Sequence, residues 1–110
     1  AVISIETNYA NAHYNLGVIY LDKCKPLAGE IESLSYEASL PLEDQIDSLY
    51  MIAGSAFAKA LKYGSYSKSE KLELAVALRK IYGRLKQNDT SGIYQSRYNQ
   101  YKSLCEKLSD

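Results

Sequence analysis

The side chains best suited to acid–base or metal chemistry in this chain are one histidine, His13, and a group of carboxylates, Glu43, Asp44 and Asp47. A single histidine excludes metal sites built from several histidines and excludes catalysis by a histidine pair. The carboxylates fall in the first turns of an expected helix, where the helix dipole favours negative charge. They therefore fit a solvated helix start better than a general acid–base pair.

The two cysteines, Cys24 and Cys105, lie far apart and form no CxxC pair, the spacing typical of zinc and dithiol redox sites. A disulfide would join the first and last expected helices, but buried free thiols are the favoured interpretation. The chain also contains no nucleophile elbow, phosphate-binding loop or dinucleotide fingerprint. We therefore expect a protein that is not an enzyme and that holds no cofactor and no metal.

Charge is divided unevenly along the chain, although the net charge is zero. Residues 1–55 hold two basic and eight acidic residues, a net charge of −6, whereas residues 56–110 hold eleven basic and five acidic residues, a net charge of +6. Either the two halves fold against each other, or a charged face meets another molecule, as in head-to-tail association. The basic half is diluted by Glu70, Glu73 and Glu106 and has no dense Lys or Arg stripe, which argues against nucleic-acid binding.

The elements that position these residues are expected to be helices. At 110 residues, with 46% apolar and 24% charged residues, the chain has the composition of one globular, soluble domain over residues 1–110. No apolar run reaches about 18 residues, so no membrane span is expected. The stretch 9–21 is apolar, aromatic or small at nearly every position, which is typical of a helix with neighbours on several sides.

Apolar spacing and the positions of proline and glycine predict an all-α fold of about five antiparallel helices. The expected ranges are about 8–24, 26–40, 42–63, 67–86 and 91–108, with Pro26 and Pro41 opening the second and third helices. Ser67 followed three residues later by Glu70 predicts a capping box. The short connections predict a hairpin over 9–40, a longer hairpin over 42–86 and a C-terminal packing or capping helix over 91–108.

Two segments share one pattern, HYNLGVIY at 13–20 and YMIAGSAF at 50–57. Each begins with His or an aromatic residue, has glycine at its fifth position and ends on an aromatic residue. Gly17 and Gly54 lie 37 residues apart, near the period of about 34 residues known for one class of helical repeat. Glycine within a helix costs about 0.8–1 kcal/mol relative to alanine, so we predict that a neighbouring helix crosses closely at each glycine.

This pattern resembles that of the tetratricopeptide repeat (TPR) family, W-x2-L-G-x2-Y. The positions that carry the resemblance are His13 in place of Trp, then Leu16, Gly17 and Tyr20, with Pro41 where the repeat-closing proline belongs. The departures are Gly29, Ser33 and Ala53, which replace a helix-B alanine, an aromatic residue and a leucine. The resemblance covers residues 9–63 and fades beyond them; a generic helical bundle is the alternative fold.

The resemblance implies a protein-binding adaptor or chaperone-like module, with a groove between the helices expected over 9–24 and 42–63. The groove positions of the family correspond here to Asn11, Tyr14, Asn15, Val18, Ser48, Met51, Ile52 and Ser55. Tyr14 and Val18 replace the Lys and Asn of the family's carboxylate clamp, so that clamp is not expected. Such an apolar groove suits a helical or extended apolar segment of a protein or peptide partner. The alternative is a structural or homo-oligomerisation domain whose groove is filled by its own chain or by a second copy.

Overall fold

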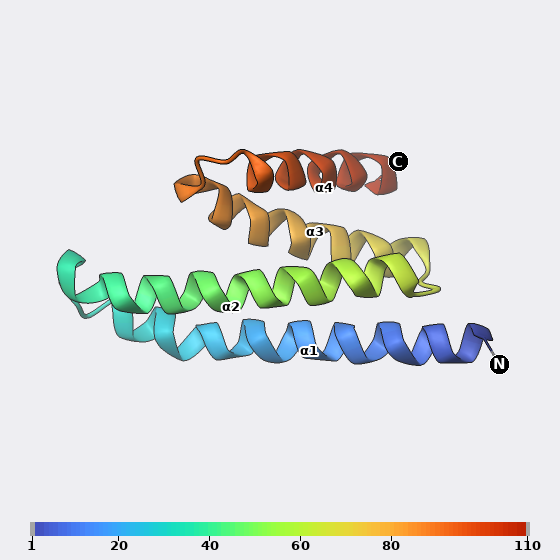
Figure 1. Cartoon of the computed structure of the whole chain (residues 1–110), viewed down its shortest axis with the longest axis horizontal. Coiled ribbons are helices and arrows are strands. Elements are labelled where there is room, and N and C mark those ends of the chain that lie inside the picture. Colours follow the sequence, from blue (N-terminus) through green and yellow to red (C-terminus); the bar gives the residue numbers. More distant parts are fainter. Residues whose placement is uncertain (1, 110) are drawn as a thin grey trace.

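The computed structural model describes residues 2–109, and the side chains of residues 9–109. Its elements are α1 (Val2–Ile31), α2 (Tyr36–Tyr63), α3 (Lys68–Leu85), the 3₁₀ helix η1 (Lys86–Asn88) and α4 (Ile93–Ser109). Figure 1 shows the four long helices side by side in chain order, each antiparallel to the one before. The all-α prediction is confirmed, but the described residues form four α-helices and not five. Across this described part, no helix is long and apolar enough to cross a membrane.

Helix α1 runs through Pro26, so the helix break predicted at this residue is wrong. Pro26 is exposed, and water can therefore solvate the backbone carbonyl that loses its helical hydrogen bond. Cys24 before the proline is buried, and Leu27 and Ile31 after it are half-buried. Packing of α1 on both sides of Pro26 thus outweighs a proline cost of about 3 kcal/mol.

Helix α2 begins at Tyr36, five residues before Pro41, so the second predicted break is also wrong. The Ser35 hydroxyl caps the helix by accepting a hydrogen bond from the Ala38 N–H at 3.3 Å. The turn therefore lies at residues 32–35. The helix predicted over 26–40 is therefore divided between α1 and α2. The hairpins of the structure are α1–α2 and α3–α4, and not the predicted hairpins over 9–40 and 42–86.

Helices α1 and α2 approach each other closely at Gly17. A methyl group added there would lie 2.8 Å from a carbon of the Phe57 ring, which is buried. Ala10 and Cys24, seven residues to either side of Gly17, are buried on the same stripe. The close crossing predicted at Gly17 is confirmed.

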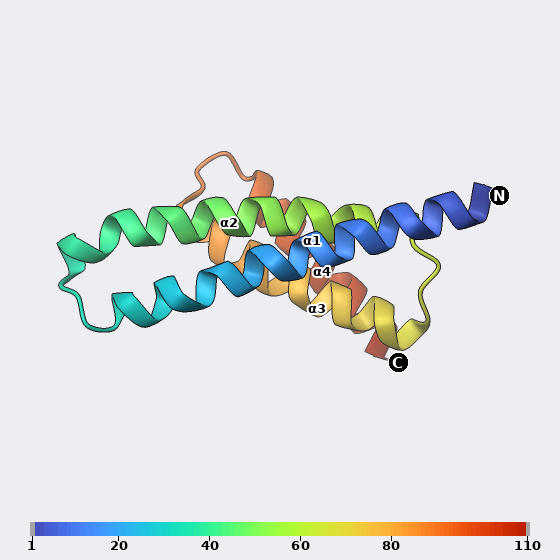
Figure 2. The same cartoon turned by 90° about the horizontal axis from the view of Figure 1, so that it is seen from below.

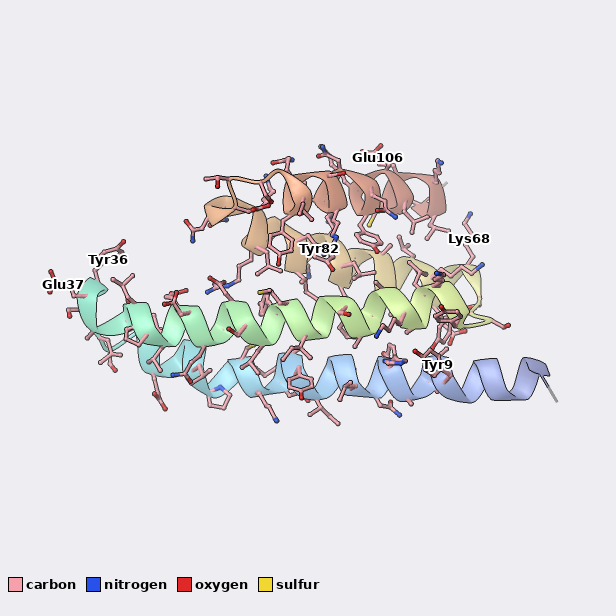
Figure 3. All side chains as sticks on the ribbon, in the orientation of Figure 1. Tyr9, Tyr36, Glu37, Lys68, Tyr82 and Glu106 are labelled. Atoms are coloured by element: carbon pink, nitrogen blue, oxygen red, sulfur yellow. The ribbon has the colours of Figure 1, made fainter. Side chains whose placement is uncertain are left out.

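The main core lies between α2, α3 and α4. Its buried members are Ala53, Phe57, Leu74, Leu78, Ile81, Tyr82, Leu85 and Tyr101. Tyr82 belongs to α3 (Figure 3), and its ring stacks on Tyr94 and Tyr101 of α4 with centroid distances of 5.8 Å to each. A methyl group at Gly54 would lie 2.9 Å from the Tyr82 hydroxyl oxygen. The second predicted close crossing is therefore confirmed as well.

The start of α3 has the predicted capping box. The Ser67 hydroxyl accepts a hydrogen bond from the Glu70 N–H at 3.2 Å, and a Glu70 carboxylate oxygen accepts one from the Ser67 N–H at 3.1 Å. These two bonds satisfy backbone donors that a helix start would otherwise leave unpaired. The sequence thus predicted this helix start correctly.

Both cysteines are buried free thiols, Cys24 on α1 and Cys105 on α4. The favoured interpretation of the cysteines is confirmed. Burial raises the pKa of the Cys24 thiol, and the positive charge of Arg84 opposes this effect only in part. The Cys24 thiol is therefore protonated at neutral pH.

The α1–α2 hairpin is longer than the α3–α4 hairpin, and its turn projects beyond the other helices (Figures 1 and 2). The molecule measures 51 × 25 × 24 Å along its principal axes. Arg84 on α3 holds the base of this projection, because its Nε donates a hydrogen bond to Asp47 at 2.8 Å and its Nη2 pairs with the Glu43 carboxylate. These ion pairs join the acidic half of the chain to the basic half. They agree with the prediction that the two halves fold against each other.

Candidate partner-binding groove

The outward face of α2 is the floor of a groove. One wall is formed by α1, and the other by residues of α3 and α4. The groove consists of two adjoining clefts that share Ser55 and Lys59. One cleft is mainly apolar and the other is basic and rich in tyrosine.

The apolar cleft has a volume of about 310 Å³ and lies between α1 and α2. Its lining residues are His13, Leu16, Met51, Ile52, Ser55, Ala56 and Lys59. Leu16, Met51 and Ile52 are 38%, 48% and 44% exposed, although each is a large apolar side chain. Three large apolar side chains therefore lie exposed together along this cleft.

The basic cleft has a volume of about 340 Å³ and continues along α2 toward its C-terminal end. Its lining residues are Tyr9, Ser55, Ala58, Lys59, Lys62, Tyr63, Tyr82, Arg97, Gln100 and Tyr101. Lys59, Lys62 and Arg97 bring three positive charges to this cleft, and none of the lining residues carries a carboxylate. The rings of Tyr9 on α1 and Tyr63 on α2 both line this cleft and meet edge to face, with 5.3 Å between their centroids.

Tyrosine rings position two of the three cations. The Arg97 guanidinium lies 5.5 Å from the ring centroid of Tyr82 and 5.8 Å from that of Tyr94. The Lys62 ammonium lies 5.3 Å from the ring centroid of Tyr63. Within residues 9–109, none of the cleft's three cations forms an ion pair with a carboxylate. Their positive charge is therefore left to act on whatever enters the cleft.

Burial raises the pKa of the Tyr82 hydroxyl, and the nearby Arg97 opposes this effect only in part. Burial likewise raises the pKa of Tyr101, which also lines the cleft. Both hydroxyls are therefore protonated at neutral pH and keep their capacity to donate a hydrogen bond. The basic cleft thus combines positive charge with neutral hydroxyl donors.

Three of the eight predicted partner-binding residues, Met51, Ile52 and Ser55, lie together in the apolar cleft. Their partners from α1 are His13 and Leu16, which the prediction did not include. All eight predicted residues are exposed. The residues of α2 were therefore predicted better than those of α1.

The predicted residues of α1 face other directions. Asn11 and Tyr14 line a separate cleft on the α3 side of α1, where the Tyr66 hydroxyl donates a hydrogen bond to Asn11 Oδ1 at 3.2 Å. Asn15, Val18 and Ser48 line neither of the two clefts of the groove. The prediction treated the helices over 9–24 and 42–63 as separated by a third helix, whereas α1 and α2 are consecutive antiparallel neighbours. Because α2 lies directly beside α1, the edge of α1 that faces the groove is not the edge that the prediction assumed.

Simple spacing signals mark the groove residues that the prediction missed. Tyr9, His13 and Leu16 follow one another at intervals of four and three, as residues on one helix edge do. Lys59 and Lys62 are three residues apart on α2, on the face away from the buried Phe57 and Ala60. Arg97 reaches the same place from α4, and no sequence signal connects that helix to this cleft.

No protein-family model, curated protein sequence or solved structure matches this chain. The TPR resemblance therefore stays a prediction from the sequence. Among the residues that the structure describes, no group of three or more His, Cys, Asp or Glu side chains is arranged to hold a metal ion. The groove over α2 combines exposed apolar side chains with three cations that form no ion pair within residues 9–109.

Proposed function

We propose that this chain is a non-enzymatic protein-interaction module that binds an apolar peptide segment, helical or extended, in the groove over α2. The observation that carries the proposal is the row of exposed Leu16, Met51 and Ile52 along one cleft. Covering these side chains with an apolar partner would remove their surface from water, which favours association. Because they stand on two packed helices, little backbone order is lost when the partner docks.

The adaptor or chaperone-like role implied by the TPR resemblance belongs to this proposal. Gly17 of the shared pattern permits the close crossing of α1 and α2, and the preceding Leu16 lines the groove beside that crossing. Within the described part, the backbone of each helix approaches only those of its neighbours in the chain, as in helical repeats. Both observations support a repeat-like scaffold that presents a groove.

The proposal predicts that one substitution in the groove abolishes peptide binding without unfolding the domain. Met51→Glu places a charge in the apolar cleft, and Val18→Glu places the same charge on an exposed residue outside it. Peptides selected from a phage-displayed library against the native chain are the probe, and fluorescence anisotropy measures their Kd. We expect Met51→Glu to raise the Kd at least about tenfold, which is about 1.4 kcal/mol, and Val18→Glu to leave it unchanged.

Folding of both variants is checked by urea unfolding, where exposed substitutions should change stability by no more than about 0.5 kcal/mol. Failure to enrich any peptide, or equal binding by the native chain and the Met51→Glu variant, contradicts the proposal.

A second candidate function is homo-oligomerisation through the same groove. The specific observation that favours it is the separation of charge, with an acidic projection on the α1–α2 hairpin and a basic cleft elsewhere in the molecule.

A further inference from the structure

The projecting end of the α1–α2 hairpin is strongly acidic. Between Lys25 and Lys59 the chain contains no Lys or Arg. The carboxylates in this interval are Glu30, Glu32, Glu37, Glu43, Asp44 and Asp47. Arg84 pairs with Glu43 and Asp47, whereas the other four are exposed and form no ion pair within the described side chains. The projection therefore keeps most of its negative charge.

The same projection, residues 30–44 and hereafter the acidic tip, also exposes large apolar side chains. Tyr36 is 78% exposed, and Leu34 and Leu40 on either side of it are exposed as well. Figure 3 shows Tyr36 and Glu37 pointing away from the rest of the molecule at the end of the hairpin. Tyr36 is thus an exposed tyrosine with Glu37 next to it in the chain, and tyrosine is among the residue types enriched at the anchor points of interfaces.

The groove over α2 carries the complementary set of side chains. Lys59, Lys62 and Arg97 supply positive charge without a neighbouring carboxylate, and the adjoining cleft is apolar. Acidic and apolar groups of the tip thus match basic and apolar groups of the groove, and such charge complementarity favours specific association.

The tip of one molecule cannot enter its own basic cleft. Tyr36 begins α2 and Lys62 lies near its end, so at about 1.5 Å per residue the helix separates them by about 39 Å. Because α2 is one continuous helix, this separation is fixed. The tip can reach a basic cleft only on another molecule.

We propose that the groove over α2 is occupied by the acidic tip of a second copy of this chain, in a head-to-tail association. The inference rests on the proposed binding role of the groove and specifies the partner. Because tip and groove are different surfaces, each association leaves one free tip and one free groove, so copies add successively or close into a ring.

Sedimentation equilibrium with two neutralising variants tests this arrangement. The groove variant is Lys59→Gln with Lys62→Gln, and the tip variant is Glu32→Gln with Glu37→Gln. For the native chain in about 0.05 M NaCl, we expect a weight-average molecular mass that rises with protein concentration. In about 0.5 M NaCl this mass should be lower at the same protein concentration, because the charges are screened. Each variant alone should associate at least about tenfold more weakly, which is about 1.4 kcal/mol.

Mixing the two variants gives the decisive result. The groove variant still has an acidic tip and the tip variant still has a basic groove, so the mixture should form one interface and stop at a 1:1 dimer. The matched control, Glu73→Gln with Glu106→Gln, changes the net charge by the same amount as the tip variant at exposed positions on α3 and α4. This control should associate like the native chain, and urea unfolding shows whether each variant is folded.

Three results would overturn the head-to-tail inference: a native chain that stays monomeric, a mixture that associates no better than its components, or a control that associates as weakly as the tip variant. A monomeric chain whose groove still binds displayed peptides would leave the proposed function intact. The two proposals therefore fail in distinguishable ways.

Discussion

Helices α1 and α3 both pack on α2, yet they are covered to very different extents. Helix α3 lies between α2 and α4, and its buried residues are Leu74, Ala75, Leu78, Ile81, Tyr82 and Leu85. Helix α1 is longer but its backbone approaches only that of α2, and its buried residues among those with described side chains are Ala10, Gly17 and Cys24. The shorter helix thus contributes more to the core than the longer one.

This contrast shows that apolar content alone does not place a helix in the core. The stretch 9–21 is the most continuously apolar part of the chain, and we expected neighbours on several of its sides. In the structure Leu16, Val18 and Ile19 remain exposed, because α1 lies at the edge of the row of helices and packs mainly on α2. Of these three residues, only Leu16 lines the groove over α2.

The largest expected effect that tests this contrast is the loss of a core side chain from α3. Leu78 is 0% exposed, whereas Ile19 on α1 is 51% exposed. Leu78→Ala should lower the free energy of unfolding by about 2–5 kcal/mol, because it leaves a cavity. Ile19→Ala should lower it by less than about 1 kcal/mol, because little buried surface is lost. Urea unfolding of both variants measures the difference, and equal losses would show that α1 is covered as fully as α3.

A smaller effect is expected where α1 meets α2. Gly17→Ala places a methyl group 2.8 Å from the buried Phe57 ring, and we expect a loss of about 1–2 kcal/mol after the gain in helix propensity. Gly29→Ala is the matched control, because a methyl group there meets nothing within 4 Å. It should raise the stability by up to about 1 kcal/mol. If Gly17→Ala and Gly29→Ala shift the urea midpoint of unfolding in the same direction, the close crossing at Gly17 is disproved.

The sequence predicted features that depend on neighbouring residues. The capping box of Ser67 and Glu70 is such a feature, because both of its hydrogen bonds lie within one helical turn. The close crossing at Gly17 was also predictable from the pattern that the segments 13–20 and 50–57 share, whereas Gly29, also within α1, meets nothing within 4 Å. The all-α class followed from the same helical spacing.

The sequence did not predict where α1 ends or where α2 begins, although the expected end at residue 63 agrees with α2. Local rules place a proline at a helix start, and they made Pro26 and Pro41 into boundaries. Both prolines are exposed, so the adjoining turns stay packed while the disturbed backbone faces water. The seven-residue spacing of Ala10, Gly17 and Cys24 was the available sign of one continuous stripe, but its meaning depends on α2 as the neighbour.

The candidate site was predicted only in part, because local patterns do not show which helix lies beside another. Met51, Ile52 and Ser55 lie on α2, whose outward face is set by its own apolar pattern, and they line the groove. The edge of α1 that faces the groove depends on which helix lies beside it, so His13 and Leu16 were missed. Arg97 joins the groove through the packing of α4 on α3, a contact that no local pattern encodes.

The smallest expected effect concerns pH and the start of α3. The hydrogen bond that the Ser67 backbone N–H donates to the Glu70 carboxylate, together with hydrogen bonding to the Ser67 side chain, lowers the pKa of Glu70. A carboxylate with a lowered folded-state pKa adds stability above its unfolded pKa of about 4.3, and this contribution is lost as pH falls through the folded value. Urea unfolding between about pH 6 and about pH 3 should therefore show a smaller acid-induced loss in Glu70→Gln than in the native chain, because Gln keeps the cap without titrating. If both lose stability equally, the charge of Glu70 does not hold this end of α3, and the firm attachment of α3 relative to α1 rests on its buried side chains alone.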